Sequence, residues 1–213
     1  STYQKISFLC FYSVKSVARI FSLYTEMKVR TMLISKSDSC LLIIDVQERL
    51  APAANDPARL INGCSKLLRG AGILNIPAVV TEQYPKGLGP SVFDIRDAAP
   101  ENTVFFPKTS LSAMGQEGFA DIMAGLGKKQ VVIAGVEEHI CVLQTAIELK
   151  EVGYDVFVVA DASASRTVDS EKAARERFKQ EGIALVTVEM VLFEWLRKAG
   201  SPEFKEIQNK LIR

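Results

Sequence analysis

The sequence has few of the residues that build metal sites and disulfide scaffolds. Among its 213 residues there is one histidine, His139, and four widely spaced cysteines. No CxxC pair occurs, so a structural zinc site is not expected. A chain of this length needs no disulfide staples, and scattered cysteines favour a reducing, cytoplasmic location.

Long apolar runs and an excess of one charge are also absent. No uncharged apolar run reaches the roughly 18 residues that indicate a transmembrane helix, so we expect no membrane span. The formal net charge is +1, whereas a nucleic-acid-binding chain usually carries a basic stripe. We therefore expect no nucleic-acid partner, and the absence of repeats and low-complexity linkers favours a single domain.

The first 37 residues differ in composition, and we expect them to be an N-terminal extension to a domain spanning 38–213. Residues 1–30 are aromatic, Ser-rich and basic, with Glu26 as the first acidic residue. That composition is typical of an organelle transit peptide, which would make the location mitochondrial. Two alternatives are an extra amphipathic helix and an upstream extension, since Met27 and Met32 precede the first clear strand.

After residue 38, short apolar runs alternate with helical patterns. Continuous apolar runs fit strands that are buried on both faces, and the alternation predicts a parallel sheet with helices on both sides. Asp56 and Pro57 are typical of a helix start, and Cys64 lies on the apolar stripe of that helix, which predicts a core position. The predicted strands are 40–46, 77–81, 103–106, 130–135, 155–160 and 183–188, with a long loop over 82–93, a helix over about 169–180 and two C-terminal helices.

Ligands of open α/β sheets bind at the carboxyl ends of the strands. Asp45 follows the first strand and has the chemistry of a general base, although a cap or loop hydrogen bond is the commoner role for such an aspartate. Lys108 follows the third strand. It could hold a thiolate and a carboxylate in place, although most loop lysines are solvated.

Cys141 opens the helix after the fourth strand, on the flank of its apolar stripe. Unpaired N–H groups and the helix dipole are expected to lower the pKa of a thiol there and to stabilise an oxyanion. The alternative is a structural cysteine that packs beneath a loop. His139 lies two residues away, and residues at that spacing on a helix do not face each other. We therefore expect His139 at the mouth of the site and not as the base.

These strand-end residues lie in three stretches, LLIIDVQERL, FFPKTSLSAM and VVIAGVEEHICVLQTAIEL, which together resemble the isochorismatase-like cysteine hydrolase family. The stretches TEQYPKGLGPSV and VVADASASR and the C-terminal helices resemble its branch of isochorismatase-domain proteins of unassigned substrate. The resemblance covers about residues 38–213. It implies an α/β fold, a three-layer αβα sandwich with a six-stranded parallel sheet, and a homo-oligomer.

The resemblance also implies a site. In it, Asp45 is the base, Lys108 is an orienting cation and Cys141 is the nucleophile. A non-proline cis peptide between Val136 and Glu137 is implied as well, and it would turn the backbone N–H groups of Glu137 and Cys141 into an oxyanion hole.

Two departures from the family pattern narrow the expected chemistry. Nicotinamidases of this family hold a metal with Asp and His ligands in the loop after the second strand. Here that loop reads TEQYPKGLGP and has no histidine, so we expect no catalytic metal and no cofactor. Isochorismatases proper lack the nucleophilic cysteine. The presence of Cys141 therefore favours cleavage of an amide or related C–N bond of a small molecule through a thioester.

Four residues flank the strand ends and are candidates for substrate binding: Gln47, Gln83, Tyr84 and His139. Two alternatives to an enzyme stay open. The triad could be retained but unused in an assembly or ligand-sensing protein, or Cys141 could be a redox sensor. The second alternative is weakened because no other cysteine lies near Cys141 in the sequence.

Overall fold

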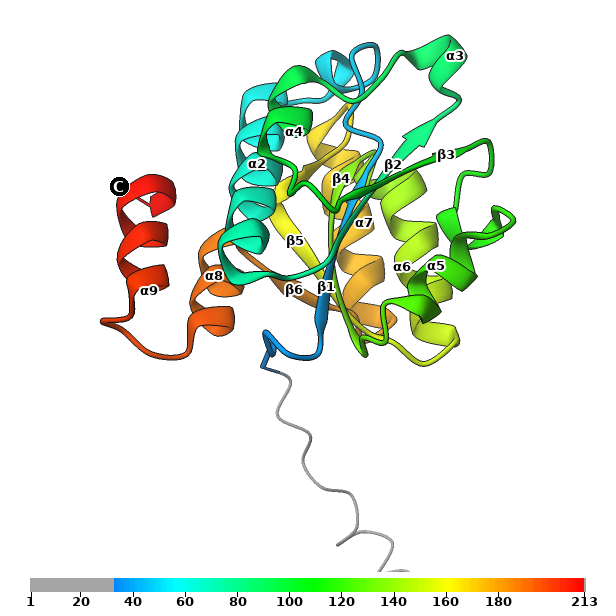
Figure 1. The fold of residues 1–213 in the computed structure, drawn as a ribbon. Coiled ribbons are helices and arrows are strands. Elements are labelled where there is room, and N and C mark those ends of the chain that lie inside the picture. The colour runs from blue at the N-terminus through cyan, green and yellow to red at the C-terminus, as the bar shows by residue number, and fades with distance from the viewer. Residues whose placement is uncertain (1–32, 213) are drawn as a thin grey trace, which may run out of the picture. The chain divides into compact units, whose positions relative to one another are not determined.

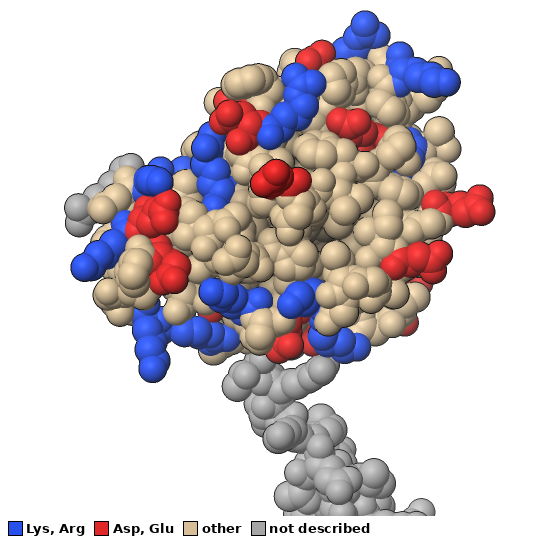
Figure 2. Space-filling view, in the orientation of Figure 1, with Lys and Arg blue, Asp and Glu red and all other residues tan. Residues whose placement is uncertain are grey.

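The computed structural model describes residues 33–212 (Figure 1). The predicted targeting segment and Cys10 lie outside the described residues. Within the described part, none of the helices combines the length and the hydrophobicity that crossing a bilayer requires. On the face shown in Figure 2, basic and acidic side chains are interspersed around a largely uncharged area.

A parallel sheet of six strands forms the centre of the described residues, as predicted. The order of the strands is β3-β2-β1-β4-β5-β6. The chain therefore starts in the middle at β1, moves outward to β3, and returns to continue on the other side with β4. Strand order reverses between β1 and β4, and a ligand site is expected at the carboxyl ends of these two strands. The strands are β1 (Ser39–Ile44), β2 (Ala78–Gln83), β3 (Val104–Lys108), β4 (Gln130–Val136), β5 (Asp155–Ala164) and β6 (Ala184–Val186).

Both faces of the sheet are covered by helices, which gives the predicted three layers (Figure 1). Along β1, Leu41 and Ile43 pack into one core, whereas Cys40, Leu42 and Ile44 pack into the other. This alternation explains why the run is apolar throughout. The first core is shared with α2 (Pro57–Leu74), α4 (Phe93–Ala98), α8 (Val188–Leu196) and α9 (Pro202–Ile207), and the second with α5 (Phe119–Gly125), α6 (Leu143–Glu151) and α7 (Val168–Gln180).

Local sequence signals explain several element ends. Asp56 caps α2 by accepting a hydrogen bond from the N–H of Arg59, with Pro57 in the first turn, and Cys64 is fully buried, as predicted. The predicted loop 82–93 contains the short helix α3 (Pro85–Leu88) and the start of α4. The predicted last strand is too long at its C-terminal end, because Thr187 caps α8 by accepting a hydrogen bond from the N–H of Met190.

The close approach of β1 and β4 at the reversal point depends on Gly135. This residue has φ 126° and pairs with Ile44. A Cβ atom at position 135 would lie 2.1 Å from the carbonyl oxygen of Ile44. Only glycine fits such a backbone conformation and such a contact.

We predict that Gly135→Ala lowers the free energy of unfolding by about 2–5 kcal/mol, because steric overlap adds to an unfavourable φ. Gly125→Ala is a matched control, since a Cβ there meets nothing within 4 Å at the end of α5. That change is expected to be neutral or mildly stabilising. Urea denaturation measures both values, and equal stabilities of the two variants would contradict the prediction.

Candidate active site

Asp45 lies directly after β1, with its side chain buried and its φ at 53°. Its N–H donates to the carbonyl oxygen of Thr81 at 3.1 Å, which continues the pairing with β2. The hydroxyl of Thr81 donates to Asp45 Oδ1 at 2.7 Å. The backbone and the side chain of Asp45 are thus both held by Thr81 of the neighbouring strand β2. The carboxylate lies at the carboxyl end of the sheet.

Lys108, the last residue of β3, forms an ion pair with Asp45. Its Nζ lies 2.7 Å from Asp45 Oδ2, and both side chains have no exposed area. The ammonium also donates hydrogen bonds to Gln83 Oε1 at 2.5 Å and to the carbonyl oxygens of Ser110 and Leu111, each at 3.2 Å. Asp45 Oδ2 accepts no hydrogen bond of good geometry. This oxygen is therefore stabilised by charge but free to accept a proton.

Cys141 lies in a π-helical turn, Glu138–Val142, that connects β4 with α6. It is 5% exposed. The pKa of its thiol is raised to about 12, first by burial and then by the charge of Asp45 and a hydrogen bond with that carboxyl, whereas Lys108 and the N–H of Glu137 oppose the shift. Burial likewise raises the pKa of Asp45, against the charge of Lys108 and hydrogen bonds from Lys108, Thr81 and Cys141.

The predicted lowering of the thiol pKa is therefore wrong. That prediction rested on the place of Cys141 in the first turn of a helix, where N–H groups and the dipole stabilise an anion. In the structure, desolvation of the sulfur and the charge of Asp45 outweigh the N–H group and Lys108. The resting sulfur is a thiol that needs a base at the moment of reaction.

The peptide bond between Val136 and Glu137 is cis. The N–H of Glu137 forms a hydrogen bond with the sulfur of Cys141. The Glu137 carboxylate points to the rim, where it pairs with Arg166 Nε at 2.6 Å.

The two glutamines of the predicted substrate set support the loops. Gln47 is fully buried, and its Nε2 donates to the carbonyl oxygens of Gln83 and Gly89 at 2.9 and 2.7 Å. Its Oε1 accepts from the N–H of Gln83 at 2.7 Å. Because these contacts use its polar atoms, we no longer expect Gln47 to bind substrate directly. The Gln83 side chain bridges Lys108 and the carbonyl oxygen of Thr109, so its first role is to orient the cation.

Tyr84 and His139 lie nearer to solvent. Tyr84 is 55% exposed, and its N–H donates to the carbonyl oxygen of Lys108 at 2.7 Å. It borders a cavity of about 270 Å³ beside Lys108. His139 is partly buried in the π-helical turn, and its Nδ1 lies 2.8 Å from the hydroxyl of Ser165. Its fixed partner is thus a serine of the neighbouring loop.

Sequence reasoning missed several supporting residues. Thr81 was read only as part of a strand, and Glu138 as part of a helix start, although it lies fully buried beside Arg175. The spacing of Glu171 and Arg175 by four residues on α7 is a helical ion-pair signal that could have been noticed. Nothing in the sequence alone links this pair to Glu138.

The described residues contain no group of three or more His, Cys, Asp or Glu side chains suited to a metal ion. At the end of β2, one carboxylate oxygen and one amide oxygen already accept hydrogen bonds. Glu82 Oε1 accepts from the N–H and hydroxyl of Ser91 at 2.7 and 2.8 Å, and Gln83 Oε1 accepts from Lys108.

Comparison with known proteins identifies the family of this chain. The family model of the isochorismatase domain matches residues 39–190. The chain belongs to the isochorismatase-domain family of hydrolases. The matched region contains all six strands of the sheet, together with Asp45, Lys108 and Cys141.

Individual members of the family are similar over most of their length. Isochorismatase domain-containing protein 1 of Danio rerio is 39% identical over 199 residues, which is 93% of this chain and 70% of the relative. A structure described as MAR1 ribonuclease from Caenorhabditis elegans has a TM-score of 0.79 and 37% identity, over 84% of this chain and 91% of that one. The YcaC gene product of Escherichia coli, an octameric hydrolase of unknown specificity, has a TM-score of 0.79 and 28% identity, over 84% and 90%.

We predict that Asp45→Asn increases the rate at which iodoacetamide alkylates Cys141 at pH 9. The negative charge of Asp45 raises the thiol pKa, so its removal lowers that pKa and increases the thiolate fraction at a given pH. In the unmodified protein the rate should still be rising at pH 9, since the pKa is about 12. Peptide mass spectrometry reads Cys141 separately from the other cysteines. A plateau below pH 8, or a slower variant, would contradict the prediction.

We also predict that Lys108→Met lowers the free energy of unfolding by about 3–5 kcal/mol, because it leaves a buried carboxylate unpaired. Adding Asp45→Asn to that variant should restore part of the loss. Arg69→Met is the control, since Arg69 and Asp97 form a half-exposed pair at 2.7 Å, and such pairs contribute less than about 1 kcal/mol. Similar losses for the buried and exposed pairs, measured in urea, would argue against a structural role for the ion pair.

Proposed function

We propose that this chain is a cysteine hydrolase that cleaves a C–N bond of amide type in a small molecule. The observation that carries the proposal is the contact of the Cys141 thiol with Asp45, whose carboxylate is paired with Lys108 at 2.7 Å in a fully buried position. A nucleophile, a base and a cation that orients the base are the elements of covalent acyl transfer.

In the proposed reaction, Asp45 Oδ2 takes the thiol proton as the sulfur attacks the carbonyl carbon. The resulting oxyanion is held by the backbone N–H groups of Glu137 and Cys141. The C–N bond breaks as Asp45 returns its proton to the leaving nitrogen, and an acyl thioester stays on Cys141. Water then attacks the thioester, with Asp45 accepting its proton, and the C–S bond breaks as that proton passes to the sulfur.

The raised pKa values support this order of events. A thiol with a pKa of about 12 is protonated at rest, so it is not consumed by unrelated electrophiles. Burial raises the pKa of Asp45, which makes it a stronger base than an exposed aspartate. The positive charge of Lys108 favours the carboxylate form of Asp45. The same protonation state disfavours a redox sensor, because peroxide reacts with the thiolate.

A cavity beside Lys108 adjoins the proposed site, although Asp45 and Cys141 are not among its lining residues. Its volume is about 270 Å³, and it is lined by Tyr84, Pro85, Lys86, Pro107, Lys108, Thr109 and Gln116. This is close to the lower limit of small-molecule sites. We propose that Tyr84 and His139 contact the substrate at the mouth of the site. Gln83 acts indirectly, by accepting a hydrogen bond from Lys108.

We also propose that the chain forms a homo-oligomer. Two observations support this. The related YcaC protein is described as octameric, and the edge strand β3 exposes 37% of Val104 and 40% of Phe105. Pro107 in the same strand lacks an N–H donor, so the apolar side chains and not strand addition would form the contact.

A second candidate, hydrolysis of RNA, is favoured by the description of the C. elegans protein as a ribonuclease. The net charge of +1 and the interspersed charges in Figure 2 favour a small neutral or mildly charged substrate instead. RNA should therefore be tested as a substrate alongside small amides.

We predict that Cys141→Ala and Cys141→Ser remove hydrolysis of small amides and leave the urea unfolding transition close to that of the unmodified protein. A loss of at least about 10³-fold is expected, because the nucleophile itself is removed. Cys40→Ser is the control, since Cys40 is a buried core residue of β1 whose thiol donates to the carbonyl oxygen of Gln130 and takes no part in the proposed reaction.

The panel should contain primary amides, carbamoyl compounds and a single-stranded RNA. Turnover of an amide that survives in Cys141→Ala would contradict the mechanism. Cleavage of RNA that is lost in Cys141→Ala, with no amide turned over, would replace the proposed substrate class.

A further inference from the structure

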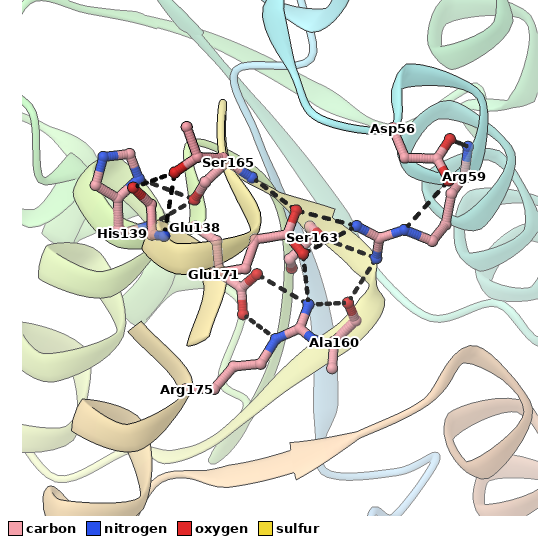
Figure 3. Close-up of polar contacts among 11 residues, drawn as sticks. Asp56, Arg59, Glu138, His139, Ala160, Ser163, Ser165, Glu171 and Arg175 are labelled. Atoms are coloured by element: carbon pink, nitrogen blue, oxygen red, sulfur yellow. Dashed lines mark hydrogen bonds and ion pairs between the residues drawn. The ribbon is translucent and has the colours of Figure 1, made fainter. Parts of the chain in front are cut away.

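A cluster of four charged side chains lies behind the turn that follows β4, outside the triad (Figure 3). It consists of Arg59 from α2, Glu138 from the π-helical turn, and Glu171 and Arg175 from α7. The two arginines and two glutamates balance in charge. The side chains of Glu138 and Glu171 are 0% and 8% exposed, and those of Arg59 and Arg175 are 29% and 30% exposed.

Arg175 holds Glu138 with both arms of its guanidinium group. Its Nε lies 2.9 Å from Oε1 of Glu138, and its Nη2 lies 3.1 Å from Oε2. Glu138 follows the cis peptide directly. A planar two-point contact fixes both the position and the rotation of a carboxylate, and here that carboxylate is anchored one residue after the N–H of Glu137.

The same arginines complete an irregular part of β5. Its pairing with β4 shifts between Ile133 and Gly135, whose partners on β5 are Val158 and Ser163. The carbonyl oxygen of Ala160 in this segment accepts from Arg59 Nη1 at 3.0 Å and from Arg175 Nη2 at 2.9 Å. Arg59 Nη1 also donates to the carbonyl oxygen of Ser163 at 3.1 Å. The cluster thus joins the end of β5 to the turn after β4.

Glu171 connects the two arginines and reaches the loop beside His139. Its Oε1 lies 3.1 Å from Arg59 Nη2, and its Oε2 lies 3.4 Å from Arg175 Nη2. The N–H of Ser165 donates to Glu171 Oε1 at 3.2 Å. The hydroxyl of Ser165 in turn contacts the backbone N–H and ring of His139. The turn is therefore held at two successive residues, Glu138 and His139.

Stability alone does not account for this arrangement. Removing several charges from water costs free energy, and well-packed apolar side chains often replace buried ion pairs without loss of stability. What four charges of fixed geometry provide is a defined position. The segment that the cluster positions is the turn around Glu138. This turn begins just after the N–H of Glu137 and contains Cys141.

We propose that Arg175 is a positioning residue for acyl transfer, acting through Glu138 to hold the N–H of Glu137 at the site of the developing oxyanion. This inference rests on the proposed function. It separates two properties of the site. Reactivity of the sulfur depends on Asp45 and Lys108, whereas stabilisation of an oxyanion depends on the turn that Arg175 holds.

Two probes distinguish these properties. Acylation of Cys141 by p-nitrophenyl acetate passes through a tetrahedral oxyanion, whereas alkylation by iodoacetamide displaces iodide and forms no oxyanion. Arg175→Lys keeps the charge but cannot reproduce the two-point contact. We expect the maximal acylation rate to fall about 10- to 100-fold, the scale of a misplaced reacting group, with KM little changed. The alkylation rate should stay close to that of the unmodified protein.

Further variants separate positioning from folding. Arg69→Lys changes an exposed pair and should leave both rates unchanged. Glu138→Gln keeps an oxygen acceptor beside Arg175 but loses one charge-assisted contact, so it should show the same selective loss even if Arg175→Lys folds poorly. Added methylguanidinium should restore part of the acylation rate of Arg175→Ala, because the arginine side chain is 30% exposed and its site is open to solvent.

Each result has a definite meaning. A selective loss of acylation with partial rescue supports the inference. Unchanged acylation in Arg175→Lys and Glu138→Gln, or an equal loss of acylation and alkylation, overturns it while leaving the proposed function in place. Alkylation of Cys141 in the unmodified protein with no acylation at all overturns the proposed function and this inference with it.

Discussion

The ion pair between Asp45 and Lys108 is the interaction around which the rest of the site is arranged. Two fully buried charges are tolerated only when each is paired and its remaining hydrogen bonds are satisfied. Thr81 holds one oxygen of Asp45, and Gln83 with two backbone carbonyls holds the ammonium. These contacts leave one carboxylate oxygen without a hydrogen bond of good geometry. The site therefore keeps a charged acceptor beside a thiol that burial holds in its protonated form.

The order of the strands brings these groups together. Asp45 follows β1, Lys108 ends β3 and Cys141 lies in the turn after β4, and strand order reverses between β1 and β4. The reversal opens a crevice at the carboxyl ends of these strands. Gly135 lets the two strands meet closely, and the turn after it places a backbone N–H against the sulfur. On the outer side, the charged cluster around Arg175 holds the same turn, so the crevice is fixed from both sides.

Much of this could be predicted from the sequence, because buried parallel strands leave continuous apolar runs and parallel sheets place strand ends on one edge. The strand-end positions of Asp45 and Lys108 followed from that rule alone. The state of Cys141 did not follow, since its pKa depends on burial and on Asp45, which is distant in sequence. The hydrogen bonds of Gln47 could not be predicted for a similar reason, because its partners are backbone atoms of residues distant in sequence. The contact of Arg175 with Glu138 joins α7 to the turn after β4, and only the folded chain shows it.

The central claim is that the resting sulfur of Cys141 is a thiol and that Asp45 receives its proton during reaction. Infrared difference spectra at neutral pH, comparing the unmodified protein with Cys141→Ala, test this most directly. The account predicts an S–H stretching band assigned to Cys141 in the resting protein. It also predicts that this band disappears when an acyl donor forms the thioester. A resting protein without that band, and with the absorbance of a thiolate that is lost in Cys141→Ala, would contradict the account.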